Sequence, residues 1–358
     1  MTSILKNKNI LVTGGSGSIG QAIVKKALED GAKSIKVFSN DENGLYEMEQ
    51  IFTNKKIEYV IGDIRNSETV NIAVKGIDII FHAAALKHVD RCELNPFETF
   101  TVNIVGTNNV VKAAVNENVK KVISISSDKA VNPIGVMGAT KLLGEKLLSA
   151  EAFHTKSKTI FASVRFGNVL HTRGSILPKI EDQIKNGGPI TLTHKRMKRF
   201  FMTKNEAVKL IVNATSLATG GEIFVLKMPL LYLNDLFEVM KEILAPNYGL
   251  NPKNIKTKTI GIRPGEKLTE YLLTDFEMEH VLETKDFFIL PSLFKSISKS
   301  KYTNAKKPDS LYKYFEKIKP MTRQEISQML KTIYPVSYTH LRAHETVLDL
   351  VCRLLLEK

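Results

Sequence analysis

The chain has 358 residues, of which 43% are hydrophobic and 25% are charged, enough for one large domain or two coupled domains. Apolar runs are all shorter than the roughly 18 residues of a membrane span, and we expect no signal peptide. The only cysteines, Cys92 and Cys352, exclude a disulfide framework. The net charge is +14, but the basic residues are scattered along the chain and no nucleic-acid-binding motif is present. We therefore interpret the charge as a solvated surface plus sites for an anionic small molecule.

The first half of the chain alternates short apolar runs with segments of helical length. Amphipathic segments such as 19–31 and 105–119 predict helices. Runs rich in β-branched residues predict strands at 9–14, 34–39, 57–62, 77–84, 121–127 and 159–166. Strands that alternate with helices favour an α/β fold, a Rossmann-type doubly wound parallel sheet with helices on both faces.

From about Asn168 the alternation of apolar runs and helical segments becomes irregular, and the predicted elements are shorter and separated by Gly, Pro and Thr residues. Residues 233–245 predict one further amphipathic helix, and the Lys/Ser-rich segment 294–310 predicts a loop. We therefore expect an NAD(P)-binding domain at 1–167, to which later segments return, and a mainly substrate-binding, smaller domain at 168–334.

A glycine-rich turn follows the first predicted strand in the stretch VTGGSGSIG. Glycines at three-residue intervals permit a tight turn and close approach of the backbone to a pyrophosphate, and the N-terminus of the next helix supplies N–H donors. We expect this turn to bind a dinucleotide through Gly14, Gly17, Ser18, Ile19 and Gly20.

The residues after the second strand leave the choice between NAD and NADP open. An acidic residue at the strand's tip favours the 2′-hydroxyl of NAD, and a basic one favours NADP. Here Ser39 and Asn40 come first, and the acids Asp41 and Glu42 come later.

Two further strand ends complete the expected cofactor site. Asp63, followed by Ile64, can accept from the adenine amino group, or it can instead cap a helix that starts near Asn66. Ala83 and Ala84 are small enough to let the nicotinamide half approach.

The segment after the fifth strand, SSDKAVNP with GATKLLGEKL, carries a specific resemblance. Together with TGGSGSIG, HAAALKHVD, RFGNVLHTRGSILP, MKRFFMT and IGIRPGEKLTE, it resembles the UDP-N-acetylglucosamine 4,6-dehydratase family of extended short-chain dehydrogenases/reductases, over nearly all of residues 8–290. The resemblance implies a UDP-sugar substrate, tightly bound NAD or NADP recycled in each turnover, assembly as a homo-oligomer and a role in surface-glycan synthesis.

The family's reaction assigns roles to the SDK triplet. The sugar is oxidised at C4, the C5 proton is removed as the C6 hydroxyl leaves, and the hydride returns to C6, so an acid and a base are needed besides the redox step. The resemblance implies Asp128 as the acid and Lys129 as the base. Alternatively, both residues merely begin a loop before Asn132.

Met137 stands where many relatives have the tyrosine that carries the proton of the redox step; other relatives have methionine there. It lies one helical turn before Lys141, which the resemblance places on the nicotinamide ribose. Methionine cannot relay a proton, so the C4 proton must pass to Ser127, Asp128, a water or a neighbouring lysine. The alternative is an inactive protein in which Met137 only packs.

A third group of residues is expected to bind the substrate. The resemblance places Asn168 on the sugar and Ser175 on the nucleotide, and Lys87, Arg199 and Arg263 are the cations we expect near the diphosphate, with Glu266 holding Arg263 or a ribose. The histidines lack metal-ligand spacing, so we assign no metal.

We therefore expect a cytoplasmic UDP-N-acetylglucosamine 4,6-dehydratase that forms a UDP-4-keto-6-deoxy sugar with retention at C5. It would have no nucleic-acid partner and no integral membrane segment. The alternatives are a UDP-hexose 4-epimerase and a non-catalytic NAD(P)-binding regulatory protein.

The last stretch of the chain, 335–358, is expected to be artefactual and not a domain. It contains PVSYTHLRAHET and, three residues later, LVCRLLLEK, and these resemble a translated sequencing adapter. We expect the natural chain to end near Tyr334.

Overall fold

The structure, a computed structural model, describes residues 3–154, 158–292, 302, 305, 306, 308 and 318–334. The expected artefactual tail and most of the Lys/Ser-rich segment 294–310 lie outside the described residues.

The first half of the chain forms the predicted strands and helices. Its strands are β1 (Asn9–Thr13), β2 (Ser34–Ser39), β3 (Ile57–Ile61), β4 (Ile79–His82), β5 (Lys121–Ser127) and β6 (Ile160–Phe166), which confirms all six predictions. Its α-helices are α1 (Ser18–Glu29), α2 (Glu42–Ile51), α3 (Ser67–Val74), α4 (Val89–Leu94), α5 (Pro96–Phe100), α6 (Thr107–Asn116) and α7 (Val136–His154). A π-helical turn, η1 (Thr101–Gly106), joins α5 to α6, and a 3₁₀ turn, η2 (Asp128–Ala130), follows β5.

The second half contains shorter elements. Its strands are β7 (Asn168–Val169), β8 (Ile190–Leu192), β9 (Lys198–Met202), β10 (Ile223–Leu226), β11 (Leu230–Tyr232), β12 (Thr257–Thr259), β13 (Leu282–Glu283) and β14 (Phe287–Leu290). Its helices are α8 (Ile176–Lys185), α9 (Lys204–Leu217), α10 (Leu233–Leu244), α11 (Asp275–His280) and α13 (Arg323–Lys331), with 3₁₀ turns η3 (Ala245–Tyr248) and η4 (Pro252–Asn254). The helix predicted at 233–245 is confirmed as α10.

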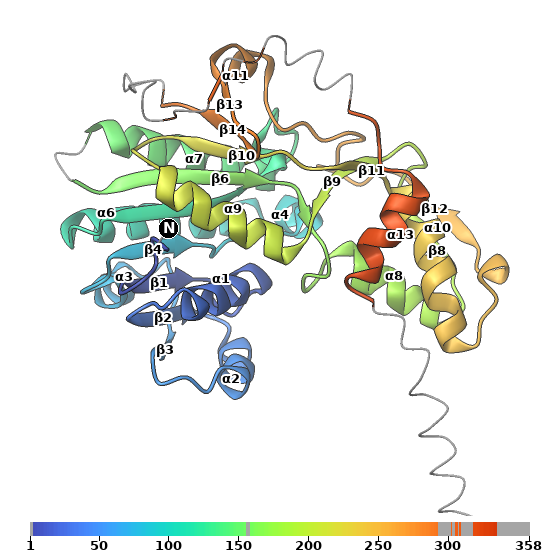
Figure 1. The fold of residues 1–358 in the computed structure, drawn as a ribbon, viewed down its shortest axis with the longest axis horizontal. Helices are drawn as coiled ribbons and strands as arrows, with labels where there is room; N and C mark the ends of the chain where they lie inside the picture. The colour runs from blue at the N-terminus through green and yellow to red at the C-terminus, as the bar shows by residue number, and fades with distance from the viewer. Residues whose placement is uncertain are drawn as a thin grey trace, which may run out of the picture.

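The main sheet has nine strands in the order β13-β14-β10-β6-β5-β4-β1-β2-β3. The strands from β3 to β10 run parallel, and β14 and β13 add an antiparallel edge. Apolar residues of α1 and α9 pack on one face, and those of α3, α6 and α7 pack on the other. The α/β, Rossmann-type doubly wound fold is therefore confirmed (Figure 1).

A smaller lobe lies beside the sheet and has its own hydrophobic cluster, built on α8, α10 and α13 (Figure 1). The three-stranded sheet β11-β9-β7 contributes to both clusters: Phe200 and Leu230 belong to that of the large lobe, and Phe201 and Leu231 to that of the small one. The chain thus enters the small lobe after β6 and returns to the main sheet through β10 and β14.

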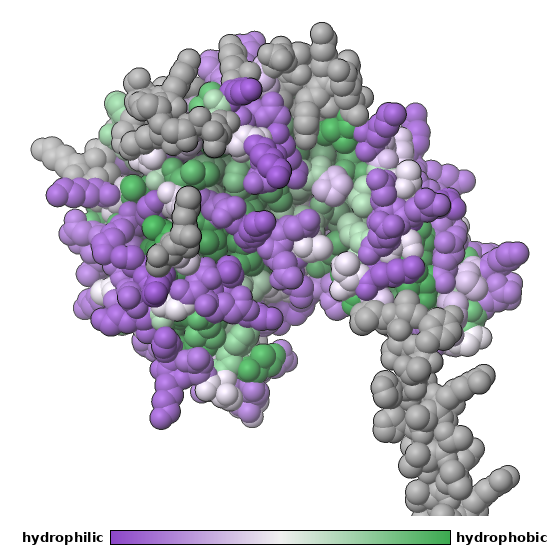
Figure 2. Space-filling model, in the orientation of Figure 1, coloured by the Kyte–Doolittle hydropathy of each residue, from purple (hydrophilic) through white to green (hydrophobic). Residues whose placement is uncertain are grey.

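Hydrophilic residues cover most of the face shown in Figure 2, with smaller hydrophobic areas between them. This distribution agrees with the interpretation of the scattered charge as solvated surface. In the part of the chain that the structure describes, no helix is both long and apolar enough to span a bilayer.

Candidate active site

A cavity of about 770 Å³ opens at the carboxyl ends of the parallel strands, where the small lobe faces the main sheet. This edge is where open α/β sheets bind ligands, because the loops after successive strands meet there. The cavity brings together every predicted site residue except Asp128: Gly14, Gly17, Ser18, Ile19, Gly20, Ser39, Asn40, Asp63, Ile64, Ala83, Ala84, Lys87, Ser127, Lys129, Met137, Lys141, Asn168, Ser175, Arg199, Arg263 and Glu266.

The glycine turn has the geometry that a dinucleotide pyrophosphate requires. Gly14 has φ +64°, and a Cβ atom there would lie 2.7 Å from Cα of Ala84. A Cβ atom at Gly20 would lie 2.5 Å from the carbonyl oxygen of Gly14. Gly17 precedes α1 without a side-chain cap, so the first N–H groups of the helix stay available to an anion. These residues fit NAD or NADP.

The substitution Gly14→Ala should lower cofactor affinity at least about tenfold, because the added methyl group both clashes with Ala84 and opposes the positive φ. Titration of the purified protein with NAD and NADP measures the effect. Gly76→Ala is the matched control, since Gly76 also has a positive φ (+71°), but a Cβ atom there would have no neighbour within 4 Å. Equal affinity in both variants would contradict the assignment.

Asp41 connects the part of the cavity at the ends of β2 and β3 to the loop between β7 and α8. Its carboxylate accepts from the backbone N–H of Gly44 at 3.0 Å, which caps α2, and from Nη2 of Arg173 at 2.8 Å. The hydrogen bond from Gly44 has the largest effect on the pKa of Asp41, and together with the contact from Arg173 it holds this pKa below its usual value. Ser39 lies beside it and shares a 2.8 Å hydrogen bond with Ser16.

Asp63 does not cap the following helix. Asn66 caps α3 by accepting from two backbone N–H groups, so the alternative interpretation of Asp63 as the cap is wrong. Asp63 instead accepts from Nε and Nη2 of Arg65, at 3.0 and 2.6 Å, and this ion pair lowers the pKa of its carboxyl. Both residues border the cavity beside Asn40.

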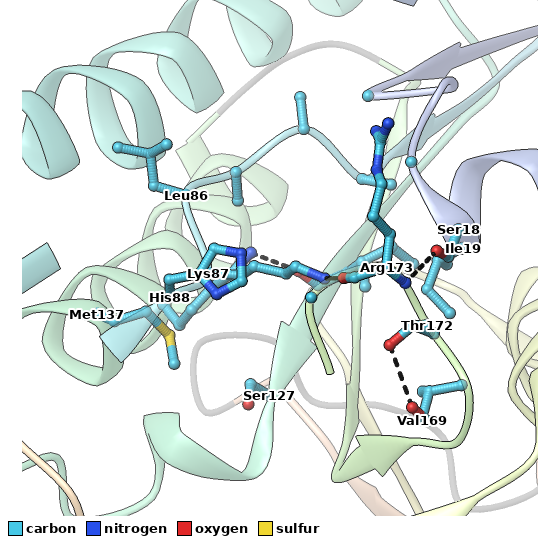
Figure 3. A pocket seen from close by; sticks show the side chains of 18 of the residues that line it. Ser18, Ile19, Leu86, Lys87, His88, Ser127, Met137, Val169, Thr172 and Arg173 are labelled. Carbon is cyan, nitrogen blue, oxygen red and sulfur yellow. Dashed lines mark hydrogen bonds between the residues drawn. The ribbon is translucent and has the colours of Figure 1, made fainter. Parts of the chain in front are cut away.

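Met137 and Lys141 share one face of α7 and border the cavity, as their spacing predicts. Lys141 donates from Nζ to the carbonyl oxygen of Ile125 at 2.9 Å, and burial lowers its pKa to about 8. Met137 is 4% exposed, and its sulfur lies on the same side of the cavity as Ser127 (Figure 3).

Asp128 is fully buried and lies behind the cavity rather than on its surface. Its Oδ1 accepts from Ser127 Oγ and from Lys129 Nζ, both at 3.0 Å, while its Oδ2 has no hydrogen-bond partner among the described residues. The expected acid and base are therefore in contact, and the hydrogen bonds of Asp128 connect it to the cavity through Ser127 and Lys129.

The expected substrate-binding residues come from both lobes. Glu266 pairs with Arg199, and its Oε1 lies 3.5 Å from Nη2 of that arginine. The side chain of Glu266 also accepts a hydrogen bond from the backbone N–H of Arg263. The Arg263 side chain is exposed and, within the described residues, forms no ion pair, so the expectation that Glu266 holds its guanidinium is not met. Ser175 Oγ is buried and has no hydrogen-bond partner among the described residues.

Lys87 and Arg173 connect the loop after β4 to the loop between β7 and α8 (Figure 3). Lys87 donates from Nζ to the carbonyl oxygen of Arg173 at 2.7 Å, and the backbone N–H of Arg173 donates to Ser18 Oγ at 2.9 Å. Burial lowers the pKa of Lys87, and the positive charge of Arg173 lowers it further. The loop that carries Arg173 therefore contacts the glycine turn directly.

Three residues that were not predicted as site residues also border the cavity: Arg173, His88 and Glu270. All three occur inside motifs that the sequence analysis singled out, TRGSILP, HAAALKHVD and IGIRPGEKLTE. Position within a motif was the only available signal, because their contacts join segments far apart in the chain.

The polysaccharide biosynthesis protein family matches residues 10–292 of the chain. An uncharacterized membrane protein of Methanocaldococcus jannaschii is 52% identical over 291 residues, which cover 81% of this chain and 87% of that protein. A UDP-glucose 4-epimerase of Rickettsia rickettsii is 36% identical over 335 residues, which cover 91% of this chain and 96% of that protein.

Solved structures agree with this relationship. The X-ray structure of Pen from Bacillus thuringiensis has a TM-score of 0.84 and 42% identity, covering 92% of this chain and 98% of that one. A dTDP-glucose 4,6-dehydratase from Streptomyces venezuelae with NAD bound has a TM-score of 0.65 at 21% identity, covering 74% of this chain and 88% of that one. At this identity the similarity shows a shared fold. The chain belongs to the polysaccharide biosynthesis protein family and has the fold of the extended short-chain dehydrogenases/reductases.

Proposed function

Because the chain belongs to this family, we propose that it is a nucleotide-sugar 4,6-dehydratase that converts UDP-N-acetylglucosamine to a UDP-4-keto-6-deoxy-N-acetylhexosamine. The observation that carries the proposal is the contact of Asp128 with Lys129 at 3.0 Å beside the cavity. An epimerase needs only the redox half of the reaction, whereas a dehydratase also needs an acid and a base.

A bound NAD or NADP would supply reversible hydride acceptance, and the residues of the glycine turn would hold it. Lys141 would bond the ribose next to the nicotinamide, and Asn168, Ser175, Arg199 and Arg263 would bind the sugar nucleotide. The proposal also includes the division into a cofactor domain (1–167) and a mainly substrate-binding domain (168–334), a homo-oligomer, a cytoplasmic location and retention at C5.

Lys129 can act as a base only as the neutral amine, so the reactive form has a neutral Lys129 beside an ionised Asp128, the ammonium proton having passed to solvent. The ionised Asp128 can then accept the proton released from O4, which makes it the acid for the C6 hydroxyl. The 3.0 Å separation of Nζ and Oδ1 is a hydrogen-bond distance, so the charge of each group affects the other. The neutral amine of Lys129 then takes the C5 proton and later returns it to C5.

Ser127 offers a route for the C4 hydroxyl proton in the absence of a tyrosine. Over the whole reaction, the proton released from O4 leaves in the water that departs from C6, since the C4 hydride ends on C6 and the C5 proton returns. Ser127 Oγ borders the cavity and donates to Asp128 Oδ1, so it can accept the O4 proton while passing its own to Asp128. The buried acid thus acts through Ser127 and Lys129.

Incubation with UDP-N-acetylglucosamine, followed by the mass of the sugar nucleotide, tests the function. Loss of one water supports the dehydratase. The relatives named UDP-glucose 4-epimerase favour a second candidate, a UDP-hexose 4-epimerase, which would leave the mass unchanged and invert the sugar at C4. Cofactor binding without conversion of any UDP-sugar would favour a non-catalytic protein instead.

The substitution Met137→Tyr should be tolerated, with the rate of water loss within about tenfold of wild type, because Ser127 already provides a proton route. The matched variant Met137→Leu keeps the apolar side chain and should stay within about threefold. Product formation measured by mass checks both. Complete loss in the tyrosine variant, with an unchanged unfolding temperature, would mean that the shape of methionine is essential.

A further inference from the structure

Glu270 is a buried carboxylate beside the proposed base. The residue is 2% exposed, and its Oε1 lies 3.7 Å from Nζ of Lys129. Its Oε2 lies 3.4 Å from Nζ of Lys267 but forms no hydrogen bond within the described residues. A buried carboxylate oxygen without a hydrogen bond is costly, so its placement requires an explanation.

A second, much smaller cavity lies next to Glu270. Its volume is about 10 Å³, and Lys129, Lys267, Glu270 and Met137 all line it. This volume is about the smallest that accepts one water molecule, and the three charged residues provide the polar partners that a buried water needs. Met137 borders both cavities, so the small one adjoins the residue that stands where the resemblance places a tyrosine in many relatives.

The oxygens around Lys129 match the three N–H donors of an ammonium group. Nζ lies 3.0 Å from Oδ1 of Asp128, 3.5 Å from Oδ1 of Asn168 and 3.7 Å from Oε1 of Glu270. Asp128 changes its proton during the proposed reaction, so it is not a constant partner. Glu270 is the carboxylate in this set that has no other proton-transfer role.

We propose that Glu270 is a positioning residue that stabilises the positive charge Lys129 gains on taking the C5 proton, with one water in the small cavity bonded to Oε2. The proposal rests on the proposed dehydratase function. The C5–H bond breaks, its electron pair forms the C5–C6 double bond as the C6–O bond breaks, and the proton remains on Nζ. Glu270 stays anionic throughout and holds that proton on Lys129 until it returns to C5.

The variant Glu270→Gln tests this role because it keeps the shape of the side chain and removes its charge. We expect the rate of water loss to fall about tenfold or more, with KM and cofactor content within about threefold. The ammonium of Lys129 loses an anionic neighbour, so the rising limb of the pH–rate profile should move to lower pH by about one unit. A structural role would lower the rate without moving this limb.

Two further variants make the comparison specific. Glu270→Asp keeps the charge, so its rising limb should remain at the wild-type pH even where its rate is lower. Glu279→Gln removes an exposed carboxylate of α11, and both its rate and its profile should match wild type. An unmoved limb in Glu270→Gln, or the same shift in Glu270→Asp, would overturn the proposal.

A second readout needs no turnover and therefore separates this proposal from the proposed function. Acylation of the folded protein with an amine reagent, followed by peptide mass analysis, gives the pH of half-maximal labelling at Lys129. In Glu270→Gln this pH should be lower by about one unit than in wild type. An unchanged labelling profile would overturn the role of Glu270, whereas failure of the wild type to release water would overturn the dehydratase function alone.

Discussion

The substitution Lys129→Ala should lower the rate at which water is released from the sugar nucleotide by at least about a hundredfold, because it removes the proposed base at C5. Cofactor binding should stay at the wild-type level, since the glycine turn and Lys141 are unchanged. The mass of the product with time and the NAD(P) content of the purified protein measure the two effects separately.

The control for this variant is Lys209→Ala, which removes an exposed lysine of α9 and should not alter turnover. Lys129→Ala also leaves the fully buried Asp128 without its ammonium partner, so its unfolding temperature is compared with wild type. Normal turnover in a folded Lys129→Ala protein would remove Lys129 from the mechanism.

A second large effect is expected at Arg165, which is fully buried in β6 between two carboxylates. Nη2 lies 2.6 Å from Oε2 of Glu145 in α7, and Nη1 lies 2.9 Å from Oε2 of Glu277 in α11. Burial alone would lower the pKa of Arg165, but the two carboxylates raise it above its usual value. Arg165→Met should reduce the free energy of unfolding by about 3–5 kcal/mol, because it leaves two buried charges unpaired.

Arg323→Met is the matched control for Arg165→Met. Arg323 pairs with Asp235 at 3.1 Å, but its side chain is 53% exposed, so its loss should cost no more than about 1 kcal/mol. Urea unfolding of both variants measures the difference. Equal losses would show that the buried group of Arg165, Glu145 and Glu277 adds nothing beyond a surface ion pair.

The parallel part of the main sheet was predictable because local composition determines it. Runs such as residues 57–62 are rich in apolar and β-branched residues and are bounded by helical segments, and each became a strand within two residues of the predicted ends. The strands β10 and β14 were not predicted. Each is four residues long and uniformly apolar, so no periodicity separates it from a buried helical turn.

The candidate site was predictable where its residues lie at the end of a strand or just after it. Strand ends of a parallel sheet share one edge, and Gly14, Ser39, Asp63, Ala83 and Ser127 meet there for that reason. Contacts between distant segments were not predictable. Glu270 reaches Lys129 across 141 positions of the chain, and the sequence contains no pattern that pairs them.

The path of the chain between the lobes limits how the protein can be recombined with its relatives. The hydrophobic cluster of the small lobe draws on three separate stretches, around 170–201, 231–255 and 326–330, and β10 and β14 return to the main sheet between them. A chimera with a single crossover after residue 167 would pair β6 of one parent with β10 of the other. An exchange of the small lobe between two parents therefore requires grafting all three stretches while keeping the parent's own β10 and β14.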